Sequence, residues 1–221
     1  MRRFLIIFIC AAGYSVALPV AGQQVAVAPK ISTLGYGADV IVGLGSYVHL
    51  RGGLHRGDVT RDLTHNEIEY EGDVELSSEN LFLDLYPGGR GFRITLGAIR
   101  NDNIYEARST ENTIVEVNGV PYPVALVGRI RAVATTDEVG PYLGIGFGNA
   151  FRGSSRFRLL FDIGAYAHGE PIVDLIAEPN PGIPLPPSFE EDLAAEERSL
   201  QDEISDYEIY PVVSLSLAFR F

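Results

Sequence analysis

The chain ends in Tyr207-Glu208-Ile209-Tyr210-Pro211-Val212-Val213-Ser214-Leu215-Ser216-Leu217-Ala218-Phe219-Arg220-Phe221, and this stretch decides the fold class. From Ile209 onward every second residue is apolar, while the positions between them include Ser214, Ser216 and Arg220. Alternation with a period of two places one set of side chains on each face of a strand. A strand that ends on an aromatic residue, with its apolar row facing outward, is typical of the closing strand of a transmembrane barrel. The alternative is an edge strand of a soluble sandwich.

The other end of the chain favours the barrel, because it has the pattern of a secretory signal peptide. Met1-Arg2-Arg3 is positively charged, Phe4–Ala12 is apolar, and Leu18–Gly22 offers small residues for cleavage. We expect residues 1–22 to be a signal peptide and residues 23–221 to form the barrel domain. Cys10 follows Ile9 rather than a small residue, which argues against a lipoprotein signal.

Cysteine content and charge exclude some classes of structure and function. Cleavage removes Cys10, the only cysteine, so the mature chain relies on no disulfide. Cleavage also removes two arginines and no acid, which leaves 15 basic and 29 acidic residues and a net charge of −14. A chain this acidic is a poor candidate for nucleic-acid binding, which needs a cationic surface.

Several further segments alternate as the C-terminal strand does, and their second face carries charge, imidazole or glycine. Such segments occur at 34–43, 48–55, 92–98, 143–148 and 157–168. Polar side chains fill the lumen of a small barrel and glycines leave room for them. The sequence therefore predicts an all-β fold, a closed antiparallel transmembrane β-barrel.

The lengths of the connections predict its topology. Residues 44–47, 87–90 and 149–155 are short connections, whereas 57–66, 108–125 and 170–206 are long. Outer-membrane barrels have short periplasmic turns and long external loops, and the two kinds alternate here as required if 126–148 is one strand broken near Asp137-Glu138. Seven strands then follow Ser32. An even number requires an eighth strand, for which only residues 23–31 are available.

Two inserts interrupt the external connections. Asn118-Gly119, between two valine-containing runs, predicts a small hairpin. Residues 188–206 predict a short acidic helix in the last external loop, with Ser188 and Glu191 as a capping box. Nine acids and one arginine between Glu190 and Glu208 supply −8 of the net charge.

The chain resembles the small outer-membrane β-barrel proteins of Gram-negative bacteria, in the broad OmpA/OmpW-like group. The residues that carry the resemblance are 33–38 (Thr-Leu-Gly-Tyr-Gly-Ala), 50–53 (Leu-Arg-Gly-Gly), 141–149 (Pro-Tyr-Leu-Gly-Ile-Gly-Phe-Gly-Asn), 210–215 (Tyr-Pro-Val-Val-Ser-Leu) and the final Phe-Arg-Phe. The resemblance implies the fold and a location in the bacterial outer membrane. It brings no activity and no catalytic residues.

The predicted lumen face gathers a set of polar side chains that we expect to form a hydrogen-bonded network, because buried charge must be compensated. This set is Asp39, His49, Arg51, His55, Arg93, Arg158, Asp162 and Arg220. Leu217, Phe219 and Phe221 are the expected C-terminal signal for the barrel-assembly machinery. The other expected partners are outer-membrane lipid and lipopolysaccharide, and no cofactor or metal site is predicted.

The sequence favours a non-enzymatic role, because no Gly-x-Ser-x-Gly motif occurs and no His and Ser stand two residues apart. An envelope-structural role or a narrow, porin-like solute pore is the leading hypothesis. A lipid-modifying enzyme and a surface adhesin or interaction protein are the alternatives.

Overall fold

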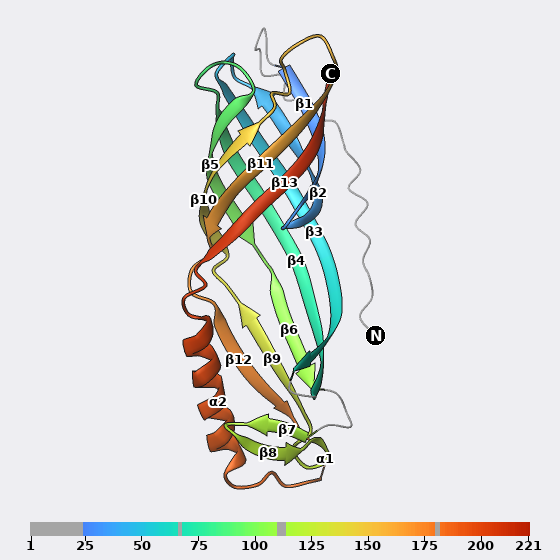
Figure 1. Ribbon diagram of the computed structural model, residues 1–221, viewed down its shortest axis with the longest axis vertical. Helices are drawn as coiled ribbons and strands as arrows, with labels where there is room; N and C mark the ends of the chain where they lie inside the picture. The colour runs from blue at the N-terminus through green and yellow to red at the C-terminus, as the bar shows by residue number, and fades with distance from the viewer. Residues whose placement is uncertain (1–23, 66–67, 110–113, 180–181) are drawn as a thin grey trace.

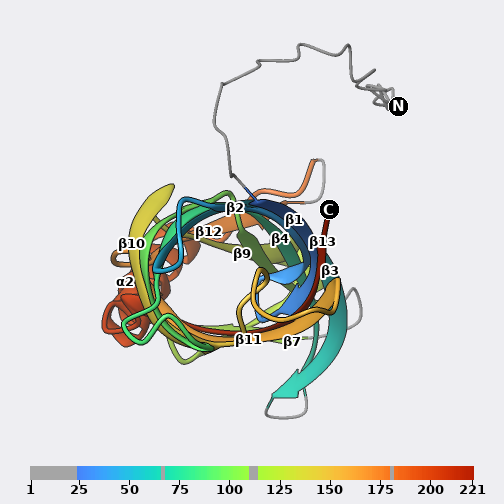
Figure 2. The same cartoon turned by 90° about the horizontal axis from the view of Figure 1, so that it is seen from above.

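The structure, a computed structural model, describes residues 24–65, 68–109, 114–179 and 182–221, so the predicted signal peptide lies outside the described residues. Eight strands close into an antiparallel barrel (Figure 1, Figure 2). They are β1 (Gln24–Ser32), β2 (Gly35–Gly43), β3 (Val48–His65), β4 (Ile68–Leu85), β5 (Phe92–Asn101), β10 (Val139–Phe147), β11 (Phe157–Ala167) and β13 (Ile209–Arg220). The ring closes because β1 pairs with both β2 and β13 while β5 pairs with both β4 and β10.

The predicted barrel of eight antiparallel strands is therefore confirmed. The first strand, expected within residues 23–31, is β1, and it aligns Val27 with Phe219 of β13. The prediction that 126–148 is one barrel strand, broken near Asp137-Glu138, is correct only for its second part. A break lies there, but only β10 belongs to the barrel, because β9 (Arg129–Thr135) pairs outside the ring. Three short turns, at 44–47, 86–91 and 148–156, lie at one end of the barrel together with the C-terminus (Figure 1). We call this the turn end.

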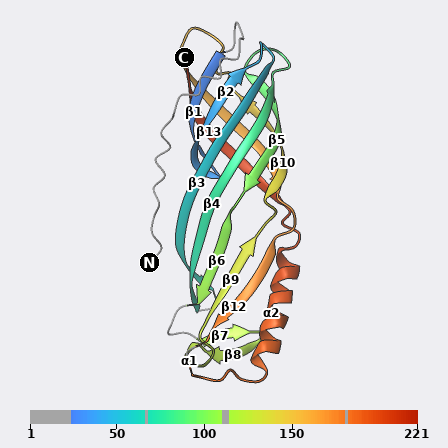
Figure 3. The same ribbon diagram turned by 180° about the vertical axis from the view of Figure 1, so that it is seen from behind.

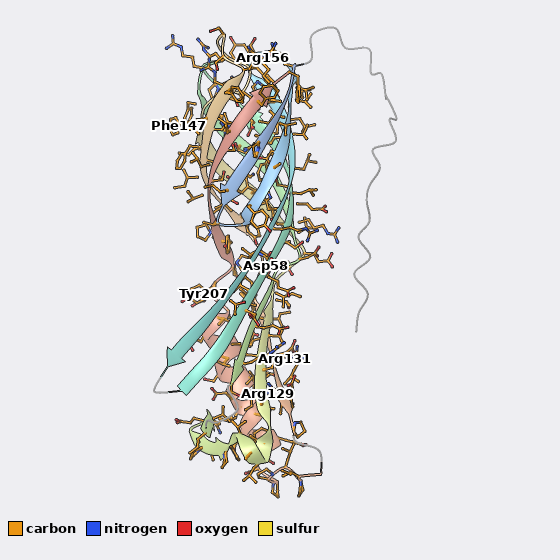
Figure 4. The ribbon with its side chains drawn as sticks, turned by 90° about the vertical axis from the view of Figure 1, so that its right-hand side faces the viewer. Asp58, Arg129, Arg131, Phe147, Arg156 and Tyr207 are labelled. Carbon is orange, nitrogen blue, oxygen red and sulfur yellow. The ribbon has the colours of Figure 1, made fainter. Side chains whose placement is uncertain are left out.

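The barrel wall has an apolar outside and a polar inside. In β13 the outward Ile209 and Leu217 are 65% and 45% exposed, whereas the inward Ser214 and Ser216 are 4% and 3% exposed. Phe147 of β10 likewise points away from the barrel (Figure 4). The period-two alternation read from the sequence therefore separates an outer apolar surface from a filled interior.

At the opposite end the strands continue into a second region, which we call the head. Its sheet contains the outer parts of β3 and β4, β6 (Ile104–Ser109), β9 and β12 (Ile172–Glu178), in the order β3-β4-β6-β9-β12. The hairpin β7 (Ile114–Val117) and β8 (Val120–Pro123), the short helix α1 (Val124–Val127) and the helix α2 (Phe189–Ile204) complete it (Figure 1).

The head corrects the prediction that 57–66 is a long connection without a strand, and that the acidic helix is the regular element of 170–206. Residues 57–65 extend β3, which pairs with β4 as far as His65 and Ile68, and residues 172–178 form β12. The polar residues of 57–62, such as Asp58 and Arg61, have the composition of a loop. A strand surrounded by water needs no apolar face when backbone hydrogen bonds to its neighbour hold it, so composition misled the assignment.

The hairpin and the helix of the head follow the sequence prediction, except for the cap. Asn118 and Gly119 form the turn with φ of 53° and 73°, which is the left-handed backbone that Asn-Gly favours. α2 occupies most of the expected 188–206. The capping box of Ser188 and Glu191 is wrong, because the side chain of Ser188 makes no capping hydrogen bond. Its hydroxyl lies 3.2 Å from that of Tyr122 instead.

The helix α2 also covers one edge of the head sheet, that of β12 (Figure 3). The N–H of Leu175 donates to Glu197 Oε2 at 2.9 Å, and the N–H of Val173 donates to Gln201 Oε1 at 3.0 Å. An uncovered edge offers such groups to other chains for strand pairing. Two side chains one helical turn apart therefore protect β12 from pairing.

Neither helix in the described part of the chain has the length and hydropathy needed to cross a bilayer.

Candidate functional site

The middle of the barrel lumen holds a layer of ion pairs centred on Arg51. Its guanidinium donates to both oxygens of Asp162 at 3.1 and 3.2 Å and to Asp84 Oδ1 at 3.0 Å. A third carboxylate, Asp39, lies 3.5 Å from Arg51 Nη1. Bidentate arginine–carboxylate pairs of this kind are strong and geometrically specific. The lumen therefore has a rigid polar centre.

Two further cations complete the layer. Arg93 donates to Asp162 Oδ1 at 2.6 Å, and Lys30 donates to Asp39 Oδ2 at 2.8 Å. The layer thus contains three cations and three carboxylates, all 6% exposed or less. Equal numbers of cations and carboxylates matter because a buried charge without a partner is costly. We call these six side chains, Lys30, Asp39, Arg51, Asp84, Arg93 and Asp162, the charge layer.

Neutral groups and glycines fit around the charge layer. The Thr95 hydroxyl donates to Asp84 Oδ1 at 2.7 Å, and the Ser214 hydroxyl donates to Asp162 Oδ2 at 3.3 Å. A Cβ at Gly146 would lie 2.8 Å from both the Arg93 guanidinium carbon and Asp162 Oδ1, closer than real Cβ atoms approach. This lumen glycine therefore makes room for an arginine rather than for a water path.

Buried apolar side chains lie on both sides of the charge layer. Along β13 the inward residues run Val212, Ser214, Ser216, Ala218, so the polar ones lie between apolar neighbours. Toward the turn end lies a cluster of Ala26, Ala28, Ile41, Ala150, Leu160 and Ala218. Toward the head lies a cluster of Leu34, Phe82, Ile99, Tyr142, Tyr166 and Val212.

Ring stacking consolidates the cluster on the head side. Phe82 and Tyr142 stack at 4.4 Å between centroids, and the Arg51 guanidinium lies 5.1 Å from the Phe82 ring. The second contact has the geometry of a cation–π interaction. Polar and apolar layers of the lumen are therefore in direct contact.

Two solved structures from Acinetobacter baumannii are similar to the chain over nearly its whole length. CarO2 has a TM-score of 0.60 and 23% identity, over 91% of this chain and 100% of that one. CarO has a TM-score of 0.59 and 23% identity, over 90% and 98% of the two chains.

The fold is that of an outer-membrane β-barrel.

A major outer membrane protein of Thermus thermophilus also aligns, over 91% of this chain and 100% of that one, with a TM-score of 0.43 and 12% identity. No protein-family model and no curated protein matches the chain.

The predicted lumen residues divide into two groups in this outer-membrane-type barrel. Six lie inside at 2% exposure or less, namely Asp39, His49, Arg51, His55, Arg93 and Asp162. Arg158 and Arg220 lie at the turn end, where they donate to the backbone carbonyls of Arg152 and Phe151 at 2.7 and 2.8 Å. These two arginines therefore hold the turn of residues 148–156 and have no hydrogen bond to the charge layer.

Sequence reasoning missed two members of the charge layer, Lys30 and Asp84. Lys30 belongs to the strand whose faces were not assigned, although the row Ala26, Ala28, Lys30 carries the period of two. Asp84 lies between outward Leu83 and Leu85, so the same alternation places it inside. In both cases the alternation places the side chain on the inner face. The sequence does not show which residues of the neighbouring strands lie beside it.

The expected C-terminal signal forms an aromatic cluster at the turn end. The Phe219 ring lies 5.1 Å from that of Phe157 and 5.2 Å from that of Phe221. Leu217 and Phe221 are exposed on the outer surface. Recognition of these residues by the assembly machinery stays a prediction.

The lumen also brings together the three residue types of a hydrolytic triad. His55 Nε2 lies 3.8 Å from Asp39 Oδ1, and Ser78 stands directly opposite His55 on the neighbouring strand. Within the part of the chain that the structure describes, the two ring nitrogens of His55 and the hydroxyl of Ser78 have no hydrogen-bond partner. A working triad requires hydrogen bonds between nucleophile, base and acid, and a substrate that reaches them. All three side chains are at least 96% buried, so the arrangement does not favour hydrolysis.

Proposed function

We propose that this chain is a non-enzymatic outer-membrane protein with an envelope-structural role, in which a closed barrel anchors the head at the cell surface. The observation that carries the proposal is the filled lumen. A charge layer with equal numbers of cations and carboxylates lies between two apolar clusters. An eight-stranded barrel has an interior just wide enough for side chains to fill.

The orientation follows from the two ends of the barrel. Three short turns and the C-terminus lie at the turn end, and the head lies at the other. In outer-membrane barrels the short turns face the periplasm and the long segments face outward. The acidic helix α2 and the head sheet would then be displayed outside, where lipopolysaccharide is the neighbouring lipid.

Planar-bilayer recording of the purified mature protein tests the closed lumen. We expect no conductance steps when insertion is verified independently by protease protection. Arg93→Ala removes one cation and side-chain volume from the charge layer, so small steps are expected only in this variant. Regular steps from the unaltered protein, with an ion selectivity that shifts in Arg93→Ala, would contradict the closed anchor.

A narrow solute passage is the second candidate, and one specific observation favours it. Several lumen atoms have no hydrogen-bond partner among the described residues, among them both side-chain nitrogens of His55, the side-chain amide of Asn80 and the hydroxyl of Ser216. Buried polar atoms of this kind are commonly satisfied by internal water. A hydrated lumen favours a passage, and the recording above separates the two candidates.

The location and the partners belong to the same proposal. Export through a cleaved signal peptide and insertion by the barrel-assembly machinery through Leu217, Phe219 and Phe221 would place the chain in the outer membrane of a Gram-negative cell. Membrane fractionation with N-terminal sequencing of the mature protein tests both steps. Recovery of the protein in the soluble periplasm, with residues 1–22 still attached, would contradict them.

An adhesin role would require the head to bind a partner at the cell surface. Deletion of residues 179–206 removes α2 and uncovers the edge of β12. If the head has no part in forming the barrel, this variant should insert and conduct as the unaltered protein does. Loss of binding to cells or matrix in this variant, with normal insertion, would favour a surface interaction protein over an envelope-structural role.

A further inference from the structure

Five arginines gather at the turn end of the barrel. The turns of residues 44–47, 86–91 and 148–156 contain no acidic residue, although the chain as a whole is strongly acidic. Figure 4 shows Arg156 at this end, whereas the acidic helix α2 lies at the opposite end, in the head (Figure 1). The turn end is therefore a cationic surface on an acidic protein, formed by Arg90, Arg152, Arg156, Arg158 and Arg220.

The positive charges of this surface are not neutralised by the protein. Among the residues that the structure describes, none of the five arginines forms an ion pair with a carboxylate. In the charge layer, by contrast, every cation has a carboxylate partner. Like charges at one narrow end of a barrel repel one another, so an anion bound among them is favoured.

Backbone carbonyls position three of these arginines without removing their charge. Arg152 donates to the Gly89 carbonyl at 2.6 Å, and Arg220 donates to the Phe151 carbonyl at 2.8 Å. Arg158 Nε donates to the carbonyl of Arg152 at 2.7 Å. A guanidinium group has five N–H donors, and Arg152 uses one of them in this way. Because the Arg152 side chain is exposed, its other donors are available to a ligand.

A groove of about 480 Å³ lies beside these guanidinium groups. Its wall contains Arg152 and Arg158 together with the apolar Leu159, and Gly91, Gly148, Asn149 and Gly153 complete it. Leu159 is 62% exposed and belongs to the outward row of β11, which we expect lipid to cover. The groove therefore offers positive charge next to an apolar surface, and no acidic residue lines it.

Phenylalanines of the outer wall place the groove at the edge of the membrane. Phe92, Phe147 and Phe157 are exposed, and each stands next in sequence to a residue that lines the groove. The rings of Phe92 and Phe147 lie 5.6 Å apart, and that of Phe157 lies 5.1 Å from Phe219. In outer-membrane barrels such aromatic girdles lie at the two interfaces, level with the lipid headgroups. A headgroup is therefore the group that meets the arginines.

We propose that this groove binds the headgroup of an anionic phospholipid, of the phosphatidylglycerol type, in the periplasmic leaflet. The phosphate accepts hydrogen bonds from Arg152 and Arg158, because guanidinium groups match phosphate oxygens in a two-pronged geometry. The acyl chains lie along Leu159. A phosphatidylcholine headgroup carries its own cation, which the arginines repel. The inference rests on the membrane location and orientation of the proposed function, but not on the closed lumen.

Native mass spectrometry of the folded mature protein, released from detergent micelles, tests this site. Phosphatidylglycerol and phosphatidylcholine with the same acyl chains are added in equal amounts, and the lipid adducts are distinguished by mass. A basic side chain at an anionic membrane surface contributes about 1 kcal/mol, which is about fivefold in affinity. Two arginines at the phosphate therefore predict a preference for phosphatidylglycerol of about 25-fold.

Single arginine substitutions locate the site. Arg152→Gln should lower the preference about fivefold. Arg156→Gln removes the same charge from a side chain that makes no hydrogen bond, so it replaces the first variant if heat-modifiable gel mobility shows that Arg152→Gln does not fold. Arg100→Gln is the matched control, because it removes one exposed arginine at the head end of β5 and should leave the preference unchanged.

Four results would overturn the inference. The first is equal retention of the two lipids by the inserted, unaltered protein, and the second is the same loss in Arg100→Gln as in Arg152→Gln. The third is displacement of the lipid by glycerol phosphate at the same concentration, which would show a site for a free anion without contact to the acyl chains. The fourth is stronger retention of lipid A than of phosphatidylglycerol, which would exclude the periplasmic leaflet.

The same measurements separate this inference from the proposed function. An unaltered protein that does not insert into membranes would overturn both. A protein that inserts and stays closed in bilayer recordings, but retains the two phospholipids equally, would overturn the lipid site alone.

Discussion

The barrel and the head of this chain bury opposite kinds of side chain. The barrel encloses Lys30, Arg51, Arg93 and three aspartates, and its outer wall is apolar. The head encloses a core of Val115, Val117, Tyr122, Val124, Val127, Ile130 and Phe189. Its outer sheet face carries ion pairs such as Glu106–Arg131, with Arg129 and Arg131 visible in Figure 4.

This difference indicates which solvent surrounds each region. A fold that displays apolar side chains needs hydrocarbon around it, and one that displays charge needs water. Both regions share strands, since β3 and β4 run from one into the other. The change of interior between barrel and head therefore marks the expected membrane boundary. Four experiments test this comparison of the two regions.

The largest expected effect comes from breaking the charge layer with Asp162→Ala. Arg51 and Arg93 would lose a shared carboxylate, and removing one partner of a buried ion pair costs about 3–5 kcal/mol. We expect a lower urea midpoint for the barrel in detergent, measured by heat-modifiable gel mobility. Asp174→Ala, at an exposed position of β12, is the matched control and should change little. Equal midpoints for the two variants would show that the charge layer contributes nothing to stability.

The next effect should be confined to the head. Phe189 is fully buried, and its ring lies 5.1 Å from that of Tyr122. Phe189→Ala should cost about 3 kcal/mol through the lost contacts and the cavity. We expect faster proteolysis within the head while the gel mobility of the barrel is retained, and Ile183→Ala, at an exposed position before α2, should not change it. A barrel that unfolds together with the head would mean that the two regions are one cooperative unit.

A third pair of variants compares the two outer surfaces directly. Ile163 near the middle of β11 is 45% exposed, and Ile172 of β12 is 58% exposed. Arginine at Ile163 should cost about 2–3 kcal/mol if lipid covers that wall. Arginine at Ile172, where water is expected, should change stability by less than about 0.5 kcal/mol. Urea unfolding in lipid vesicles measures both, and similar losses would contradict the assigned boundary.

The smallest effect is a pH dependence of the hairpin on α2. Hydrogen bonds from Tyr122 and Asn118 lower the pKa of Asp192, and the hydrogen bond to Asp192 raises the pKa of Tyr122. The contribution of Asp192 is therefore present above the usual carboxyl pKa of about 4 and is lost as pH falls through the lowered value.

The contribution of Tyr122 has the opposite sign, since it is lost as pH rises above the usual tyrosine pKa of about 10. Proteolysis of the β7–β8 hairpin should thus be slowest between these two limits. Tyr122→Phe keeps the ring and removes the hydroxyl, so it should abolish the alkaline arm of the profile and reduce the acid arm, where Asn118 still donates to Asp192. An unchanged profile in this variant would show that other groups cause it.

Much of the barrel could be predicted because its alternation is local. The row Ile209, Val213, Leu217 indicates an outward face without reference to any other strand, and the lengths of 44–47 and 149–155 indicate the turn end. The head could not be predicted in the same way. β12 and the outer part of β3 are held by backbone pairing and by Glu197 and Gln201 of α2, which local composition does not record.

The sequence by itself determined that strands alternate between an apolar and a polar face, and that Arg51, Arg93 and Asp162 belong to the polar one. That is a property of each residue and its near neighbours. Only the tertiary structure decided that these three meet with Lys30 and Asp84, and that Arg158 and Arg220 do not. Contacts between residues as far apart as 51 and 162 depend on the register of every strand between them, which no single segment fixes.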